Sequence, residues 1–142
     1  VSGQGIANAF GFFYETGRLD RTPEIDEIAG LPDAEKPGAI AATATSNEGL
    51  AEVMRLFVRV YARYASNTAL FFLPLGGLYL AGGIAAKNES WFTTDHLFMR
   101  TFESNYNDRI TPLLHETPVV LIKDYEVSLY GAAHAAISLA EA

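Results

Sequence analysis

Two adjacent glycines, Gly82 and Gly83, interrupt an apolar segment in which a strand-like run, Leu78–Ala81, gives way to helix-like residues. Glycine has no Cβ, so its backbone adopts unusual dihedral angles and can lie directly against a ligand or another segment. A second stretch of this kind opens the chain, where Ser2 is a suitable helix cap and Gly3 follows it. These two stretches are where backbone groups could do chemistry.

The opening stretch has two interpretations. Gly3 and Gly5 leave amides at a helix start without covering side chains, which would let a phosphate or a nucleotide sugar approach backbone donors. A capped helix with tight packing explains the same residues equally well.

Side chains that usually carry catalysis are scattered. His96, His115 and His134 are far apart and have no second ligand type at metal-binding intervals, so no metal site is predicted. Asp124 and Glu126 follow an apolar run, but strand-like alternation would point them to opposite sides, which favours surface charges. The sequence has no G-x-S-x-G elbow, no P-loop and no complete G-x-G-x-x-G motif.

Composition narrows the class of protein. A chain of 142 residues with 49% hydrophobic residues can form one globular domain with a real core. A net charge of −7 argues against a nucleic-acid surface, which needs clustered Lys and Arg. The absence of cysteine excludes disulfides and thiolate metal sites and fits a reducing compartment, so the cytoplasm is the expected location.

Neither the start of the chain nor its most apolar run has the pattern of a targeting segment. The first residues lack the basic start and continuous apolar centre of a signal peptide, and the absence of an initial Met suggests a piece of a longer protein. The run 69–86 is long enough to suggest a membrane span, but Pro74, Gly76 and Gly77 would break it. We therefore expect no membrane segment.

Several helices are predicted before residue 75. One begins behind Ser2, one at Thr22 and Pro23, and one covers Pro37 to Thr43. Thr45 and Glu48 form a capping-box pattern ahead of a long helix. Its predicted apolar face consists of Leu50, Val53, Met54, Phe57, Val60, Tyr61 and Tyr64. A second face carries Arg55, Arg59 and Arg63, which could contact an anion or form a solvated surface.

The rest of the chain predicts an incomplete sheet. Leu78–Ala81 and Pro118–Ile122 read as buried strands, with helical pieces over Trp91–Ser104 and Asn105–Leu114 between them. A strand, a helical crossover and a strand imply a parallel pair. Two strands are too few for a self-contained α/β sheet, so we expect missing strands to complete it. A last helix begins near Ser128 with a thin face of small residues, Gly131, Ala132, Ala133, Ala135 and Ala136.

The order of five stretches, VSGQGIAN, ASNTAL, GGLYLAGGI, PVVLI and LYGAAHAA, resembles the bacterial glucokinases over nearly the whole chain. That family belongs to the actin-like and hexokinase-like sugar kinases, in which two lobes with ribonuclease-H-like sheets enclose ATP and sugar. The resemblance implies that residues 1–142 are the carboxy-terminal part of the large lobe. The implied fold is α/β, a helix-rich part of a ribonuclease-H-like lobe with two parallel strands, incomplete without upstream residues.

The resemblance also implies a nucleotide site. Gly82 and Gly83 match the paired glycines of the family's adenosine motif, where the backbone lies against the nucleotide. Ser2 and Gly3 match the start of the SG-x-G stretch on the nucleotide side of the cleft. Gly131 and Ala132 match small residues of the last connecting helix. The implied ligands of the intact enzyme are ATP, Mg²⁺ and glucose, with glucose 6-phosphate and ADP as products.

The family's other functional parts have no counterpart in this sequence. Its amino-terminal phosphate loop, general-base aspartate, second phosphate turn and sugar-binding residues all lie upstream of the matched segment. We therefore expect no catalytic residue here and an inactive chain when isolated from the amino-terminal portion. A non-catalytic nucleotide-binding or oligomerisation module of the same fold, or a structural α-rich domain, is the alternative, and a homodimer remains open.

Overall fold

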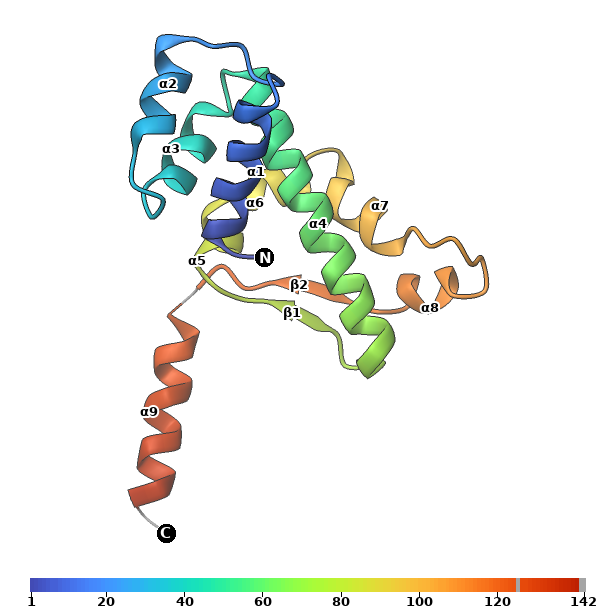
Figure 1. Ribbon diagram of the computed structural model, residues 1–142. Coiled ribbons are helices and arrows are strands. Elements are labelled where there is room, and N and C mark those ends of the chain that lie inside the picture. The colour runs from blue at the N-terminus through green and yellow to red at the C-terminus, as the bar shows by residue number, and fades with distance from the viewer. Residues whose placement is uncertain (125, 141–142) are drawn as a thin grey trace.

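The computed structural model describes residues 1–124 and 126–140 and shows a helix-rich fold with one small parallel sheet (Figure 1). The elements follow in the order α1 (Gly3–Glu15), α2 (Pro23–Gly30), α3 (Lys36–Thr43), α4 (Glu48–Phe72), β1 (Leu78–Leu80), α5 (Gly83–Lys87), α6 (Glu89–Thr93), the 3₁₀ turn η1 (Thr94–His96), α7 (Leu97–Glu103), α8 (Thr111–His115), β2 (Val119–Leu121) and α9 (Val127–Ala140).

The long helix α4 organises the fold, because α1, α3, α6, α7 and α8 all pack on it. Its start differs from the predicted capping box. Asn47 is the cap, and its Oδ1 accepts from the Leu50 N–H at 3.1 Å. The Thr45 hydroxyl instead donates to the Ala42 carbonyl at 3.0 Å, so the prediction for Thr45 was wrong. The predicted caps Ser2 of α1 and Thr22 of α2 are confirmed.

The buried stripe of α4 is only partly the predicted one. Leu50, Val53, Met54 and Phe57 are buried as expected, but Val60 and Tyr64 are 53% and 60% exposed. Beyond Phe57 the stripe continues through small residues, Val58, Ala62, Ala65, Ser66 and Ala69. Small side chains let the neighbouring elements approach the helix closely, and a search for large apolar residues overlooks them.

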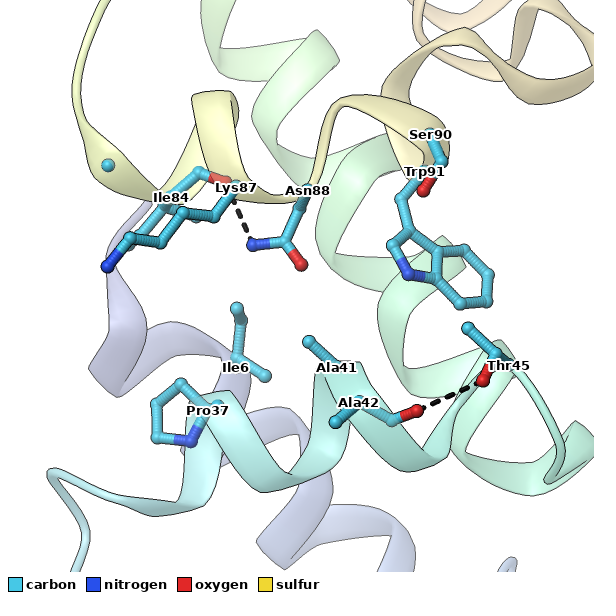
Figure 2. Close-up of a pocket in the computed structure, with 12 residues that line it drawn as sticks. Ile6, Pro37, Ala41, Ala42, Thr45, Ile84, Lys87, Asn88, Ser90 and Trp91 are labelled. Atoms are coloured by element: carbon cyan, nitrogen blue, oxygen red, sulfur yellow. Dashed lines mark hydrogen bonds between the residues drawn. The ribbon is translucent and has the colours of Figure 1, made fainter. Parts of the chain in front are cut away.

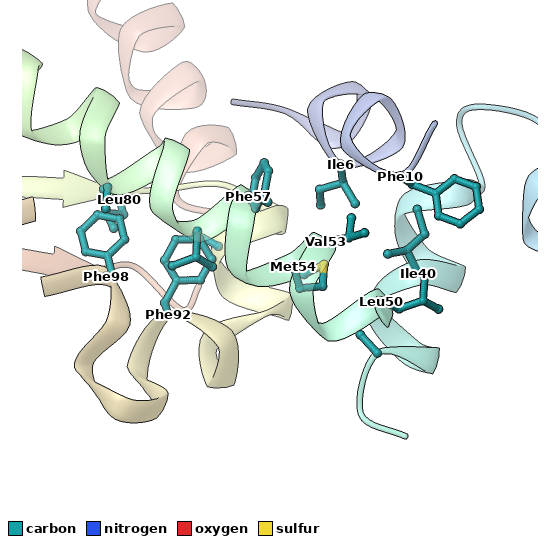
Figure 3. Close-up of a cluster of buried hydrophobic side chains, with 14 of the residues drawn as sticks. Ile6, Phe10, Ile40, Leu50, Val53, Met54, Phe57, Leu80, Phe92 and Phe98 are labelled. Atoms are coloured by element: carbon teal, nitrogen blue, oxygen red, sulfur yellow. The ribbon is translucent and has the colours of Figure 1, made fainter. Parts of the chain in front are cut away.

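The apolar core lies on both sides of α4 (Figure 3). On one side α1 and α3 contribute Ile6, Phe10 and Ile40. On the other side α6 and α7 contribute stacked aromatic rings, with centroids 5.5 Å apart for Phe92 and Phe98 and 6.3 Å apart for Phe98 and Phe102. The Tyr61 ring from α4 meets Phe92 edge-on at 5.4 Å, which joins the second side to the long helix.

The two predicted strands pair in parallel, as expected, with Leu78 opposite Val119 and Leu80 opposite Leu121. Each observed strand lies within the predicted range and is shorter. A turn precedes β1 and requires Gly77, whose φ is +105° and whose Cβ would lie 3.1 Å from the Pro118 carbonyl oxygen. Leu80 is buried against the helices, whereas Tyr79 on the opposite face is 60% exposed, so the prediction of buried strands was wrong for that face.

The predicted helical pieces between the strands are more broken than expected. Asp95 and His96 both have φ of +53°, which ends α6 and redirects the chain into α7. Most of Asn105–Leu114 is not helical, and only α8 forms there. The side chains of Asn105 and Asn107 accept from backbone N–H groups two residues later, at 3.0 and 3.1 Å. Such turns compete with helix formation, which explains the wrong prediction.

The last helix, α9, projects away from the rest of the fold at the end of β2 (Figure 1). None of its described side chains is buried, and a Cβ at Gly131 would meet no atom within 4 Å. The thin face predicted on this helix is present but packs against nothing described. Within residues 1–124 and 126–140, no helix is both long and apolar enough to cross a membrane.

The arginine face of α4 is a solvated surface stabilised by local charge pairs. Arg55 bonds to Glu48 and, at 2.7 Å, to Glu52, while Arg59 lies 3.7 Å from Glu52. Burial disfavours the charged guanidinium of Arg55, but the hydrogen bonds to Glu52 and Glu48 outweigh it and raise its pKa. Arg63 donates to the Ser104 carbonyl oxygen.

Candidate functional site

A cavity of about 680 Å³ lies where α1, α3, α5 and α6 meet (Figure 2). Its size is within the range of small-molecule pockets. Its wall is mainly apolar, with several polar groups at defined points. The lining residues are Ile6, Pro37, Gly38, Ala41, Ala42, Thr45, Gly83, Ile84, Lys87, Asn88, Ser90 and Trp91.

The paired glycines lie at this cavity, at the junction between β1 and α5. Gly83 lines both the large cavity and a smaller one of about 120 Å³, and Gly82 lines the smaller one. Gly82 has φ of +111°, a conformation that side chains disfavour. Gly83 has no such restriction, and its Cβ would meet only the Lys87 side chain, 4.0 Å away. The space in front of Gly83 is therefore open to a ligand.

The predicted residues at the chain start lie close by but do not line the large cavity. The Ser2 hydroxyl accepts from the Gly5 N–H at 3.4 Å, and the Ser2 carbonyl accepts from the same N–H at 2.9 Å. The expectation of an uncovered Gly5 amide was therefore wrong. A Cβ at Gly3 would lie 3.3 Å from Pro37 Cγ, so this glycine lets α1 pack on α3. Ile6, one turn later, is the residue of α1 that reaches the cavity.

Three polar groups around the cavity are oriented by the structure. The Asn88 Nδ2 donates to the Ile84 carbonyl at 2.8 Å, which turns its Oδ1 toward the cavity (Figure 2). The Thr45 hydroxyl donates to Ala42. The Trp91 indole forms the wall opposite Ile84 and Lys87, with its Nε1 on the cavity side (Figure 2).

The cavity wall is neutral apart from Lys87, whose ammonium group lies at its edge (Figure 2). Tyr61 lines the smaller cavity, and burial raises the pKa of its phenol, so the group is neutral at physiological pH. Among the described residues, no His, Asp and Glu side chains gather into a group that could hold a metal ion. The arrangement can bind a flat, largely neutral group and place an anion near Lys87.

The sequence points to the glycines but not to the side chains opposite them. Asn88 and Trp91 follow the glycines within one short stretch, so an asparagine at a helix end and the single tryptophan of the chain were the available signals. Pro37, Ala41, Ala42 and Thr45 come from a distant segment. Only the packing of α3 on α1 and α4 brings them to the cavity, and no local pattern predicts that packing.

Comparisons with known proteins agree on one family. A family model described as Glucokinase matches residues 1–139. The glucokinase of Nostoc sp. (strain PCC 7120 / SAG 25.82 / UTEX 2576) is 35% identical over 150 aligned positions, covering 98% of this chain and 43% of that protein. The glucokinase of Trichormus variabilis (strain ATCC 29413 / PCC 7937) gives the same three values.

A more distant relative shows the same partial coverage. The glucokinase of Synechocystis sp. (strain ATCC 27184 / PCC 6803 / Kazusa) is 31% identical, over 94% of this chain and 40% of that protein. The chain thus spans less than half the length of these relatives. No solved structure matches the chain significantly.

Proposed function

The chain belongs to the glucokinase family, and we propose that it is the carboxy-terminal part of an ATP-dependent glucokinase that supplies the adenosine side of the ATP site. The intact enzyme would convert ATP and D-glucose to ADP and glucose 6-phosphate. In this proposal residues 1–142 belong to the large, ribonuclease-H-like lobe, and the amino-terminal portion of the same protein completes both the sheet and the active site.

The observation that carries the proposal is the cavity in front of Gly83. A nucleoside needs an apolar slot of this size with a few fixed polar groups, and the cavity between α3, α5 and α6 offers both. The open space before Gly83 would let the nucleotide lie against the backbone. Ser2 and Gly3 contribute indirectly, because they begin and position the helix that carries Ile6.

Phosphoryl transfer also requires groups that bind the phosphates, Mg²⁺ and glucose. The ammonium group of Lys87 would attract the phosphates of a bound nucleotide at the cavity edge. Mg²⁺, glucose and the base that removes the proton from the sugar 6-hydroxyl would be held by the amino-terminal portion. There the 6-oxygen would bond to the γ-phosphorus as the bond to the β–γ bridging oxygen breaks. No residue of this chain is assigned a catalytic role.

The expected cellular location and oligomeric state follow from the same proposal. We expect the protein in the cytoplasm, where ATP and the sugar are available, and a homodimer is compatible with its exposed sheet face. The alternative is a non-catalytic nucleotide-binding or oligomerisation module, which would use the same cavity without turnover.

The proposal is tested by adding ATP to the chain and measuring its thermal unfolding. ATP that binds only the folded chain should raise the unfolding temperature, by an amount that grows with the logarithm of its concentration. Gly83→Val should abolish this shift, because the side chain would fill the space in front of the backbone. The variant should fold normally, since the position has ordinary dihedral angles and free space.

One control variant makes the result specific. Gly11→Val changes a glycine on α1 that also has free space around it and lies outside the cavity, so its ATP response should match the wild type. Gly82→Val is a poorer test, because its φ of +111° makes the variant strained without any ligand. A wild-type chain indifferent to ATP would refute nucleotide binding by this chain and favour a structural role.

A further inference from the structure

Asn88 is held in one orientation at the cavity, and this orientation determines which atom of its amide faces the cavity. Its Nδ2 donates to the Ile84 carbonyl at 2.8 Å, and a carbonyl oxygen can only accept. The amide therefore cannot turn over without losing that bond. Its Oδ1 consequently faces the cavity as a fixed hydrogen-bond acceptor (Figure 2).

The wall around this acceptor suits a planar heterocycle. Ile84 and Ala41 provide apolar contact, and Trp91 provides an indole ring with its N–H donor on the cavity side (Figure 2). A flat ring can pack against these groups while one of its edges meets the acceptor. Asn88 is only partly buried, so the acceptor is reachable from the cavity.

An acceptor distinguishes between purines at one atom. Adenine has an amine at C6, which donates, whereas hypoxanthine and guanine have a carbonyl oxygen there, which accepts. Two acceptors facing each other repel, and the Asn88 Oδ1 would lose its hydrogen bond with water without gaining another. The site would therefore bind the amine-bearing base and reject its carbonyl analogue.

We propose that Asn88 is a specificity-determining residue, whose Oδ1 accepts from the exocyclic amine of adenine and so selects adenine nucleotides over 6-oxopurine nucleotides. This inference rests on the proposed nucleotide site. Within that site, Asn88 would select the base.

The test compares ADP with inosine diphosphate, which differ at C6 of the base and in the proton on the neighbouring ring nitrogen. Trp91 is the only tryptophan of the chain and lines the cavity, so its fluorescence reports binding at this place. In the wild-type chain we expect inosine diphosphate to bind about tenfold more weakly than ADP. In Asn88→Leu, which has similar volume and no acceptor, the two dissociation constants should become equal.

The matched control is Asn8→Leu, because Asn8 is exposed on α1 and lies outside this cavity. It should keep the wild-type preference for ADP, and circular dichroism should show that both variants fold. Equal binding of ADP and inosine diphosphate by the wild type would overturn the role of Asn88 and leave the nucleotide site standing. Failure of both nucleotides to bind the wild type would overturn the site itself, and the inference with it.

Discussion

Ser66 has a polar group in an unusual position. Its side chain is 1% exposed on α4, and its hydroxyl finds no hydrogen-bond partner among the residues that the structure describes. A buried hydroxyl without a partner costs free energy, because it has lost its hydrogen bonds to water. In this chain Ser66 is therefore a site where a smaller apolar residue should be more stable.

We expect Ser66→Ala to raise the free energy of unfolding by about 1 kcal/mol. Part of any gain would come from the higher helix propensity of alanine, so Asn67→Ala, at an exposed position of the same helix, is the control. Chemical denaturation of both variants measures the difference. Equal gains in the two variants would show that the Ser66 hydroxyl carries no penalty.

Individual residues show how much of the candidate site could be predicted from the sequence. Gly82 and Gly83 were recognisable because two adjacent glycines between a strand and a helix are typical of a place where another group approaches the backbone closely. Their different environments were not, since only the structure shows that Gly82 has a positive φ and that a Cβ at Gly83 would meet only the Lys87 side chain. Asn88 could not be assigned, because its role depends on which end of the amide faces Ile84.

At the scale of elements, two helix starts were predicted correctly from a single capping residue each. Ser2 and Thr22 are such cases, and the structure confirms both. Before α4 the sequence has three consecutive capping-type residues, Thr45, Ser46 and Asn47, and the glutamate three residues after Thr45 led to the wrong prediction. The observed cap is set by the turn that leaves α3, where Asn47 N–H donates to the Thr43 carbonyl at 3.1 Å.

This difference between Thr45 and Asn47 can be measured. Asn47→Ala should lower the free energy of unfolding by about 1 kcal/mol, because the Leu50 N–H loses its side-chain acceptor. Thr45→Ala should change it by less than about 0.5 kcal/mol, since Thr45 is exposed and only donates to the end of α3. If urea denaturation showed a larger loss of unfolding free energy for Thr45→Ala than for Asn47→Ala, Thr45 would be the cap after all.

At the scale of the whole molecule, the fold is a helical unit with two surfaces that other segments could cover. The parallel pair β1–β2 has Tyr79 60% and Val120 39% exposed on one face. In α9, Leu129, Tyr130, Ile137 and Leu139 are all more than half exposed. The prediction of two parallel strands was correct, but the sequence could not show that α9 would lie apart from the core.

These open surfaces and the 43% coverage of the Nostoc relative lead to a prediction about activity. The chain alone should form no ADP from ATP in a glucose-dependent manner, even if it binds the nucleotide. Phosphoryl transfer requires the sugar, the metal ion, the base and the γ-phosphate to be positioned together. In the proposed site, the described residues would contact the nucleoside and, through Lys87, its phosphates. The measurement is ADP formation with and without glucose.

The outcome separates two views of the molecule. If glucose leaves ADP formation at its background rate while ATP stabilises the fold, the cavity is half of a site that the amino-terminal portion must complete. If glucose accelerates ADP formation and Gly83→Val removes the effect, residues of this chain carry out the transfer, and the assignment of no catalytic residue is wrong. Acceleration that survives Gly83→Val would point to a contaminating kinase, because that variant removes the space for the nucleotide.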